Sequence, residues 1–106
     1  MIEVTLNRIT GSVKSREGKL VRVSVYYDLN GNVVNSVMVT GDFFMEPPEA
    51  LFELMKTLKN SKIEEVPEKV RAYFSARRPL LVGATEDDFI SAFRKAIASG
   101  EKDALP

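Results

Sequence analysis

Two segments of alternating apolar residues flank a short polar turn, and this feature restricts the possible folds more than any other. Valine or tyrosine occupies every second position from Val21 to Tyr27, and a second segment rich in β-branched residues covers positions 33–40. Between them lies Asp28-Leu29-Asn30-Gly31-Asn32, whose Asn-Gly pair is common in β-hairpin turns. Alternation with a period of two is typical of a strand with one buried face. The sequence therefore predicts two adjacent antiparallel strands.

Two registers of this hairpin are compatible with the sequence. A two-residue Asn-Gly turn would place Val23 opposite Met38. A three-residue loop with Gly31 in the left-handed conformation would place Val23 opposite Val37, and would pair Tyr27 with Val33. We favour the second register because it collects the β-branched residues on one face of the hairpin.

The other face of the hairpin is also partly apolar, because Leu20, Tyr26, Val34 and Met38 are expected to point there. Large apolar patches are rarely left bare on a soluble protein. Two interpretations remain open. Either the N-terminal strand or the helices of the chain cover this face, or the face is docked on a partner protein.

The rest of the chain predicts one more strand and three helices. Residues 2–9 alternate like a strand, whereas the stretch between Gly11 and Gly18 fits either a short strand or a loop. Apolar residues then recur at helical spacing in three segments, with Thr85 and Asp88 spaced to cap the last helix reciprocally. The predicted helices run from Pro47–Pro48 to Asn60, from about Pro67 to Pro79, and from Thr85 to Gly100.

These elements predict a single α+β domain over residues 1–106, with an antiparallel sheet of three or four strands and helices packed on one face. Residues 1–10 would form an extra N-terminal strand, and residues 101–106 a frayed tail.

The composition argues against several classes of protein. Lysine plus arginine and aspartate plus glutamate both number 15, so the formal charge is zero, whereas nucleic-acid binding requires surplus positive charge. No stretch approaches the roughly 20 apolar residues of a membrane span. Met1-Ile2-Glu3-Val4 lacks the basic start and apolar run of a signal peptide. We therefore expect a cytoplasmic protein that binds neither nucleic acid nor membrane.

The chain also lacks the residues that most often carry enzyme chemistry. It contains no histidine and no cysteine, so the commonest acid–base group, nucleophile and transition-metal ligands are missing. The acidic residues Glu64, Glu65 and Glu68 are interpreted as a solvated helix start, and Arg77-Arg78 as a favourable helix end. No glycine-rich phosphate loop is present. We therefore predict no catalytic, cofactor-binding or metal-binding residue.

The most unusual segment is Thr40-Gly41-Asp42-Phe43-Phe44, which follows the second hairpin strand. Gly41 permits backbone angles that other residues resist, and Asp42 can accept hydrogen bonds from nearby amides. In an extended chain, two adjacent phenylalanines point to opposite sides. Either a local bend buries both rings in the core, or one ring is offered to another protein.

Several of these blocks resemble the C-terminal accessory domain of lipoate–protein ligases. The resemblance covers roughly residues 12–98, and the Gly-Asp-Phe-Phe block is its most specific part. A second proline before Glu49 and a richer N-terminal strand depart from the family pattern, which leaves the first ten residues unaccounted for. The matching blocks are Lys19-Leu20-Val21-Arg22-Val23, Asn30-Gly31, Gly41-Asp42-Phe43-Phe44 with Pro48-Glu49, and Gly83 to Phe89 with Ala92 and Ala96.

The resemblance implies a role that the residues alone do not. In this family a large domain binds ATP, Mg and lipoate, makes lipoyl-adenylate, and transfers lipoate to a lysine of a lipoyl domain. The accessory domain is required for the activation step and shifts position during the cycle. Some archaea encode the two parts as separate chains, and a chain that starts at its own methionine fits that heterodimeric form. The accessory domain also has a fold similar to that of the iron–sulfur scaffold proteins (the SufE/NifU-like fold).

We therefore expect an accessory subunit without activity of its own, bound to a large catalytic chain and only indirectly to lipoyl-domain proteins. An unrelated adaptor module is the alternative, and an iron–sulfur scaffold is a weaker one because such proteins need cysteine thiolates. The predicted partner-binding residues are Gly41, Asp42, Phe43 and Phe44, extended by Leu20, Tyr26 and Met38.

Overall fold

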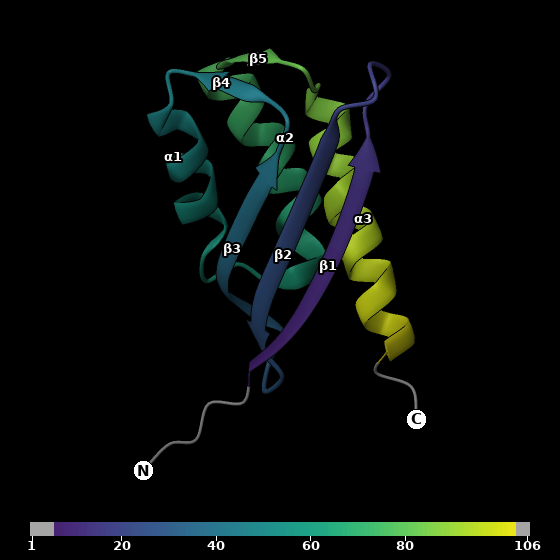
Figure 1. Ribbon diagram of the computed structural model, residues 1–106. Helices are drawn as coiled ribbons and strands as arrows, with labels where there is room; N and C mark the ends of the chain where they lie inside the picture. The colour runs from purple at the N-terminus through teal and green to yellow at the C-terminus, as the bar shows by residue number, and fades with distance from the viewer. Residues whose placement is uncertain (1–5, 104–106) are drawn as a thin grey trace.

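Three long strands form one antiparallel sheet in the order β1-β2-β3 (Figure 1). They are β1 (Leu6–Lys14), β2 (Leu20–Asp28) and β3 (Val33–Gly41). The predicted pairing of the two hairpin strands is thus confirmed, and the stretch that the sequence left undecided belongs to β1 as far as Lys14. The computed structural model describes residues 6–103, so the part of the predicted N-terminal strand that precedes Leu6 lies outside the described residues.

Helices pack on one face of this sheet, as the sequence predicts (Figure 1). A separate antiparallel sheet of two short strands follows in the chain. The sequence did not predict this second sheet. The remaining elements are β4 (Phe44–Glu46), α1 (Glu49–Leu58), a 3-10 turn η1 (Ile63–Glu65), α2 (Val66–Arg77), β5 (Leu80–Val82) and α3 (Glu86–Asp103).

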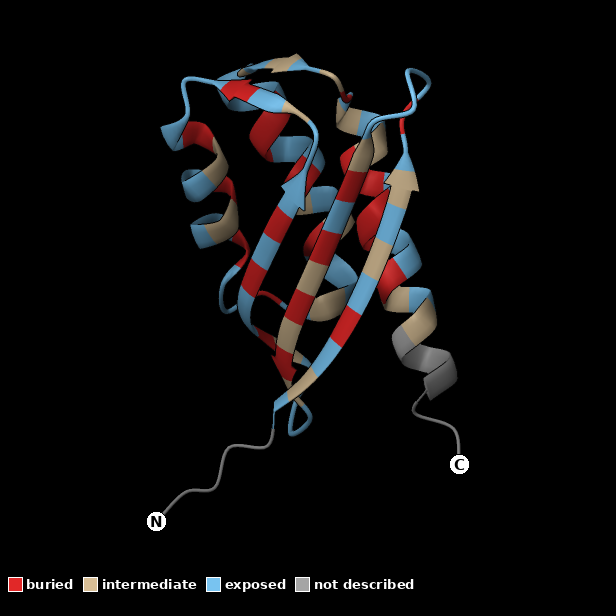
Figure 2. Cartoon of the chain, viewed as in Figure 1, coloured by how far each residue is buried: buried red, intermediate tan, exposed pale blue. Residues whose placement is uncertain are grey.

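The core lies between the inner face of the three-stranded sheet and the helices. Figure 2 shows buried residues alternating along β2 with residues that are mostly half-buried, and along most of β3 with exposed residues, as expected for strands with one covered face. Each helix contributes an apolar stripe at helical spacing. Fully buried members of the core include Val21, Val23, Val25, Val34, Leu54, Leu58, Val66, Val70, Phe89 and Phe93.

The register of the hairpin differs from the favoured prediction by two residues. Val23 lies opposite Val39 rather than Val37, and Met38 lies opposite Ser24, so neither of the two expected registers holds there. A shift of two residues keeps every side chain on its original face, so the β-branched residues still share the buried face. The left-handed conformation is taken by Asn32, with φ of 55°, while Gly31 has φ of 149°.

The difference has two sources: Asp28 pairs with Val33, so the loop is one residue longer than expected, and a β-bulge near Asn35 adds the second residue and changes the position of Val34. The pairing changes between Tyr26 and Tyr27, so one residue of β3 is left unpaired and the side chains beyond it change sides. Val34 was expected on the outer face but is fully buried. Its N–H donates to the carbonyl oxygen of Ser61 at 2.8 Å, a contact with the chain beyond α1 that the hairpin sequence cannot specify.

The backbones of β1 and α3 approach each other closely at Gly11. A Cβ atom placed on Gly11 would lie 2.2 Å from the carbonyl oxygen of Ala92 and 2.5 Å from the backbone nitrogen of Ala96. Only glycine on the strand and small residues on the helix allow this distance. The predicted end of this helix at Gly100 is wrong, since α3 continues to Asp103. A single glycine lowers helix stability by about 1 kcal/mol, which does not by itself end a helix.

Candidate functional site

The two adjacent phenylalanines point to opposite sides of the chain. Phe43 packs against the core, where its ring meets that of Phe89 edge to face with centroids 5.0 Å apart. Phe44 begins β4 and is 74% exposed. The interpretation in which both rings are buried is therefore wrong, and the alternation of an extended chain explains the split.

Backbone contacts with the start of β2 hold this segment in place. The N–H of Asp42 donates to the carbonyl oxygen of Leu20 at 2.9 Å, and its carboxylate accepts from the N–H of Leu20 at 3.4 Å. Gly41 has φ of 153°, and a Cβ there would lie 2.1 Å from the same carbonyl oxygen. The roles proposed for Gly41 and Asp42 from sequence are thus structural, and they fix where Phe44 emerges at the surface.

Phe44 belongs to an exposed apolar cluster that the sequence did not reveal in full. Val82 lies directly opposite Phe44 in the two-stranded sheet, and Leu80 lies two pairs further, opposite Glu46. Leu80 is 61% and Val82 52% exposed, whereas Met45 and Leu81 between them face inward. We call Phe44, Leu80 and Val82 the apolar patch. Its strands have three residues each, too few for periodicity to identify them.

The remaining predicted residues lie on the outer face of the three-stranded sheet, away from the helices. Leu20 and Tyr26 are half-buried there, and Met38 is 56% exposed. No helix of the described residues covers this face, and β1 extends the sheet at its edge instead of covering it (Figure 1). The interpretation in which the chain covers this face itself is therefore wrong for residues 6–103. The predicted surface thus divides into two regions on different sheets.

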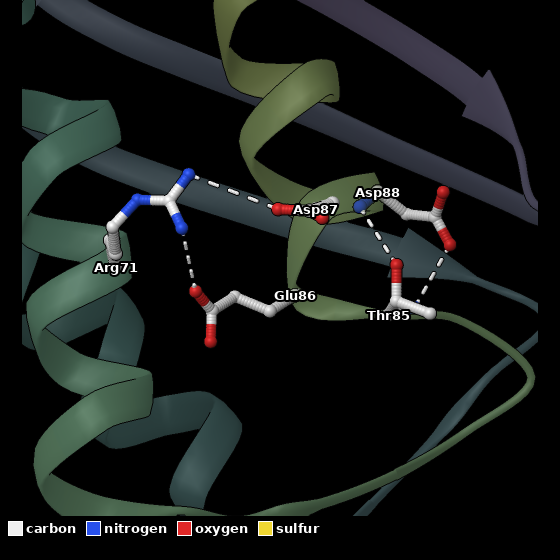
Figure 3. Close-up of polar contacts among 5 residues, drawn as sticks. All are labelled: Arg71, Thr85, Glu86, Asp87 and Asp88. Carbon is white, nitrogen blue, oxygen red and sulfur yellow. Dashed lines mark hydrogen bonds and ion pairs between the residues drawn. The ribbon is translucent and has the colours of Figure 1, made fainter.

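Ionisable residues near the start of α3 serve the helix itself. The Thr85 hydroxyl accepts from the N–H of Asp88 at 3.2 Å, and the Asp88 carboxylate accepts from the N–H of Thr85 at 2.9 Å, as the sequence predicts (Figure 3). Arg71 of α2 pairs with Glu86 at 3.3 Å and with Asp87 at 3.8 Å. An open groove of about 780 Å³ borders this helix start. In its lining, Thr85 and Asp88 are engaged in capping and Asp87 pairs with Arg71, while Arg16 and Glu17 belong to the loop after β1.

A second polar network joins α1 to α2. The Tyr73 hydroxyl lies 2.9 Å from the carbonyl oxygen of Ala50 and 2.8 Å from a carboxylate oxygen of Glu53, which also pairs with Arg77 at 2.9 Å. Burial raises the pKa of Tyr73 above its usual value, and the hydrogen bond with Glu53 raises that pKa further. Arg78 ends α2 in the left-handed conformation. These contacts are structural, in line with the helix-end interpretation of Arg77-Arg78.

Residues 6–103 contain neither a metal-binding cluster nor a membrane-spanning helix. No group of three or more carboxylates lies close enough to hold a metal ion in this part of the chain. Within the same residues, no helix combines the length and apolarity needed to cross a membrane. The apolar patch and the uncovered sheet face are therefore the surface features that need a functional explanation.

Comparison with known proteins connects the chain with lipoylation. No family model matches it. Lipoate-protein ligase A subunit 2 of Thermoplasma acidophilum is 33% identical over 81 residues, which cover 76% of this chain and 82% of that protein. A chain from the solved structures of the archaeal lipoylation system of Thermoplasma acidophilum, comprising a bipartite lipoate protein ligase and its E2 lipoyl domain, is also similar. It matches with a TM-score of 0.66 and 28% identity, over 87% of this chain and 98% of the solved one. This chain belongs to the family of lipoate–protein ligase A subunit 2.

Proposed function

We propose that this chain is the accessory subunit of a two-chain lipoate–protein ligase, and that it supports ATP-dependent activation of lipoate by binding the large catalytic chain. Membership of the subunit 2 family supports this proposal, because the similar solved chain comes from a bipartite ligase. The chain has no histidine, no cysteine and no phosphate-binding loop. ATP, Mg and lipoate would therefore be bound by the large chain.

The observation that carries the proposal is the apolar patch. Phe44, Leu80 and Val82 are each more than half exposed, and they come from two strands that hold them side by side. Aromatic residues at the centre of an apolar surface are frequent anchors of protein interfaces. The large chain is the partner that the family membership indicates, so we place the subunit interface at this patch.

Contact of this kind can assist a reaction without contributing catalytic groups. If the large chain exists in an open and a closed conformation, a subunit that binds the closed form more tightly raises its population. The closed form would exclude water and order the residues that hold ATP and lipoate. Lysines of lipoyl-domain proteins would then be modified at the active site of the large chain, and the small chain would contribute no catalytic group to that transfer.

The test is a reconstitution with purified chains. Pyrophosphate release that depends on lipoate and ATP, together with lipoyl-adenylate formation, is measured for each chain alone and for their mixture. We expect activity in the mixture and none from the small chain alone. An equal rate for the large chain with and without this subunit would contradict the proposal.

The same experiment separates this function from the alternatives. An unrelated adaptor would leave lipoate activation unchanged, even if it binds other proteins. An iron–sulfur scaffold would need thiolates for cluster or persulfide chemistry, and the chain has none. Turnover by the purified small chain would also exclude a purely accessory role.

A further inference from the structure

The outer face of the three-stranded sheet carries a polar hollow between two arginines. Arg8 on β1 lies opposite Tyr26, and Arg22 on β2 lies opposite Ser12, so the arginines stand at opposite ends of the same stretch of paired strands. Between them Thr10 faces Ser24, a pair of small hydroxyl residues. The resulting hollow of about 380 Å³ is lined by Arg8, Thr10, Gly11, Ser12, Arg22 and Ser24. Two guanidinium groups thus flank a floor of hydroxyl donors.

These arginines differ from the paired arginines of the helical layer. Arg71 and Arg77 each form an ion pair with a carboxylate. Among residues 6–103, neither Arg8 nor Arg22 has a carboxylate within ion-pair distance. Both side chains are exposed, so the face presents unneutralised donors suited to carboxylates.

The charge of the whole face is positive although the chain as a whole is neutral. In the three long strands the basic residues are Arg8, Lys14 and Arg22, and the acidic residue is Asp28. Asp28 lies at the far end of β2, opposite Leu6, and accepts a hydrogen bond from the N–H of Asn30 at 2.9 Å. The acidic residues are thus concentrated on the helical side, and the sheet face complements a negatively charged surface.

Apolar side chains beside the hollow indicate a protein ligand in preference to a small anion. Tyr26 lies opposite Arg8, and Met38 lies opposite Ser24 on the neighbouring strand. A free phosphate or carboxylate ion would use the guanidinium groups and hydroxyls but would gain nothing from these side chains. A protein surface that presents carboxylates next to apolar groups can contact both.

We propose that this face is the docking surface for the lipoyl-acceptor domain, which would present carboxylates to Arg8 and Arg22. The inference rests on the proposed function, because a lipoate ligase must meet an acceptor protein in every turnover. Permanent subunit interfaces are more apolar, whereas transient contacts depend more on charge. The apolar patch suits the large chain, and the basic sheet face suits an acceptor that binds and leaves.

The test uses the two-chain complex and a purified lipoyl domain from the same organism. Rates of lipoyl-domain modification are measured for wild type, for Arg8→Ala/Arg22→Ala, and for Arg94→Ala, which removes an exposed arginine of α3 on the helical side. Loss of two exposed ion pairs is expected to raise KM for the lipoyl domain about 2- to 30-fold in the double variant. The control variant should retain the wild-type KM.

Two further readouts exclude a merely structural effect. Lipoate activation without acceptor, measured as pyrophosphate release, should be unchanged in the double variant, which shows that the subunit is folded and bound. The difference in KM should shrink at about 1 M ionic strength, where charges are screened beyond about 3 Å. An unchanged KM, or weaker binding between the two chains, would overturn the proposal. If the wild-type mixture does not modify the lipoyl domain at all, the proposed function itself fails.

Discussion

The two sheets of this protein follow the same alternation but differ in what their outward residues are. In the three-stranded sheet the residues opposite the core are largely polar or basic, such as Arg8, Thr10 and Arg22. In the two-stranded sheet the outward residues include Phe44 and Val82, which are both more than half exposed. Alternation therefore predicts which side chains point away from the core. The chemistry of those side chains indicates what each surface can bind.

The contrast is sharpest at Phe43 and Phe44, neighbours in sequence with different environments. Phe43 extends an edge-to-face cluster in which Phe89 also meets Phe74, with centroids 5.5 Å apart. Phe44 makes none of these ring contacts and pairs instead with Val82 across the small sheet. One ring of the pair stabilises the fold, and the other remains free for an intermolecular contact.

The largest effect is expected from a truncation in the buried aromatic cluster. Phe89 is fully buried between the rings of Phe43 and Phe74. We expect Phe89→Ala to lower the free energy of unfolding by about 3–5 kcal/mol, because it removes apolar contacts and leaves a cavity. Thermal denaturation of the two-chain complex measures the loss. A midpoint near that of wild type would mean that the aromatic cluster does not support the fold.

A smaller effect is expected from truncation of the exposed Phe44, and it should concern affinity for the large chain and not stability of the fold. Phe44→Ala should weaken binding of the large chain by about 2–4 kcal/mol if Phe44 is a central anchor. Because binding of a partner stabilises the folded chain, the melting temperature of the complex should fall only by the amount that the weaker binding explains. Titration against the immobilised large chain measures the affinity, and lipoate-dependent pyrophosphate release measures the consequence.

Leu29→Ala is the control for Phe44→Ala. Leu29 is also exposed and apolar, but it lies in the β2–β3 turn at the opposite end of the sheet from the apolar patch (Figure 1). Its truncation should leave affinity for the large chain unchanged. Equal effects of the two variants, or no effect of Phe44→Ala, would place the subunit interface elsewhere.

The smallest effect concerns the network that joins the helices next to the two small strands. Tyr73→Phe removes a hydrogen bond between α2 and α1, which should cost about 0.5–1.5 kcal/mol of stability near neutral pH. Because the folded chain raises the pKa of Tyr73, the contribution is fully present below the unfolded value of about 10 and is lost as the pH rises through the raised pKa.

The pH dependence provides the check on this last variant. Denaturation midpoints of wild type should decrease above about pH 10, and those of Tyr73→Phe should decrease less. If the two curves remain parallel through this range, the Tyr73 hydroxyl does not couple its ionisation to folding. Subunit affinity should change little, because Tyr73 lies inside the helical layer and not in the apolar patch.

The parts of the candidate site that depend on local chemistry could be predicted from the sequence. The Gly41–Phe44 block is unusual in the sequence itself, whereas the amide that donates to Asp42 belongs to Leu20, which only the pairing of β2 with β3 brings near. Leu80 and Val82 could not be found, because their strand has only three residues and pairs with a segment more than 30 positions earlier. A joint role for Arg8 and Arg22 is likewise not predictable from sequence, since only the β1–β2 register places them around one hollow.

Local interactions explain what the sequence by itself determined. The period-two alternation of β2 and β3 specified their buried face, and the spacing of Thr85 and Asp88 specified the start of α3. Both signals arise from residues close in the chain, whose geometry is set by strand pleating and by helix capping. The resemblance of the Gly-Asp-Phe-Phe block likewise indicated the family that the comparisons then showed.

Only the tertiary structure decided the features that depend on distant partners. The bulge near Asn35 turns Val34 inward at the start of β3, where its N–H bonds to Ser61, beyond the first helix. Gly11 is needed because α3, eighty residues later, approaches its backbone within the space of a side chain. Phe44 became part of an apolar surface only when β5 folded beside it. In each case the deciding contact joins segments that are far apart in the chain. The local sequence does not specify which distant segment will lie beside it.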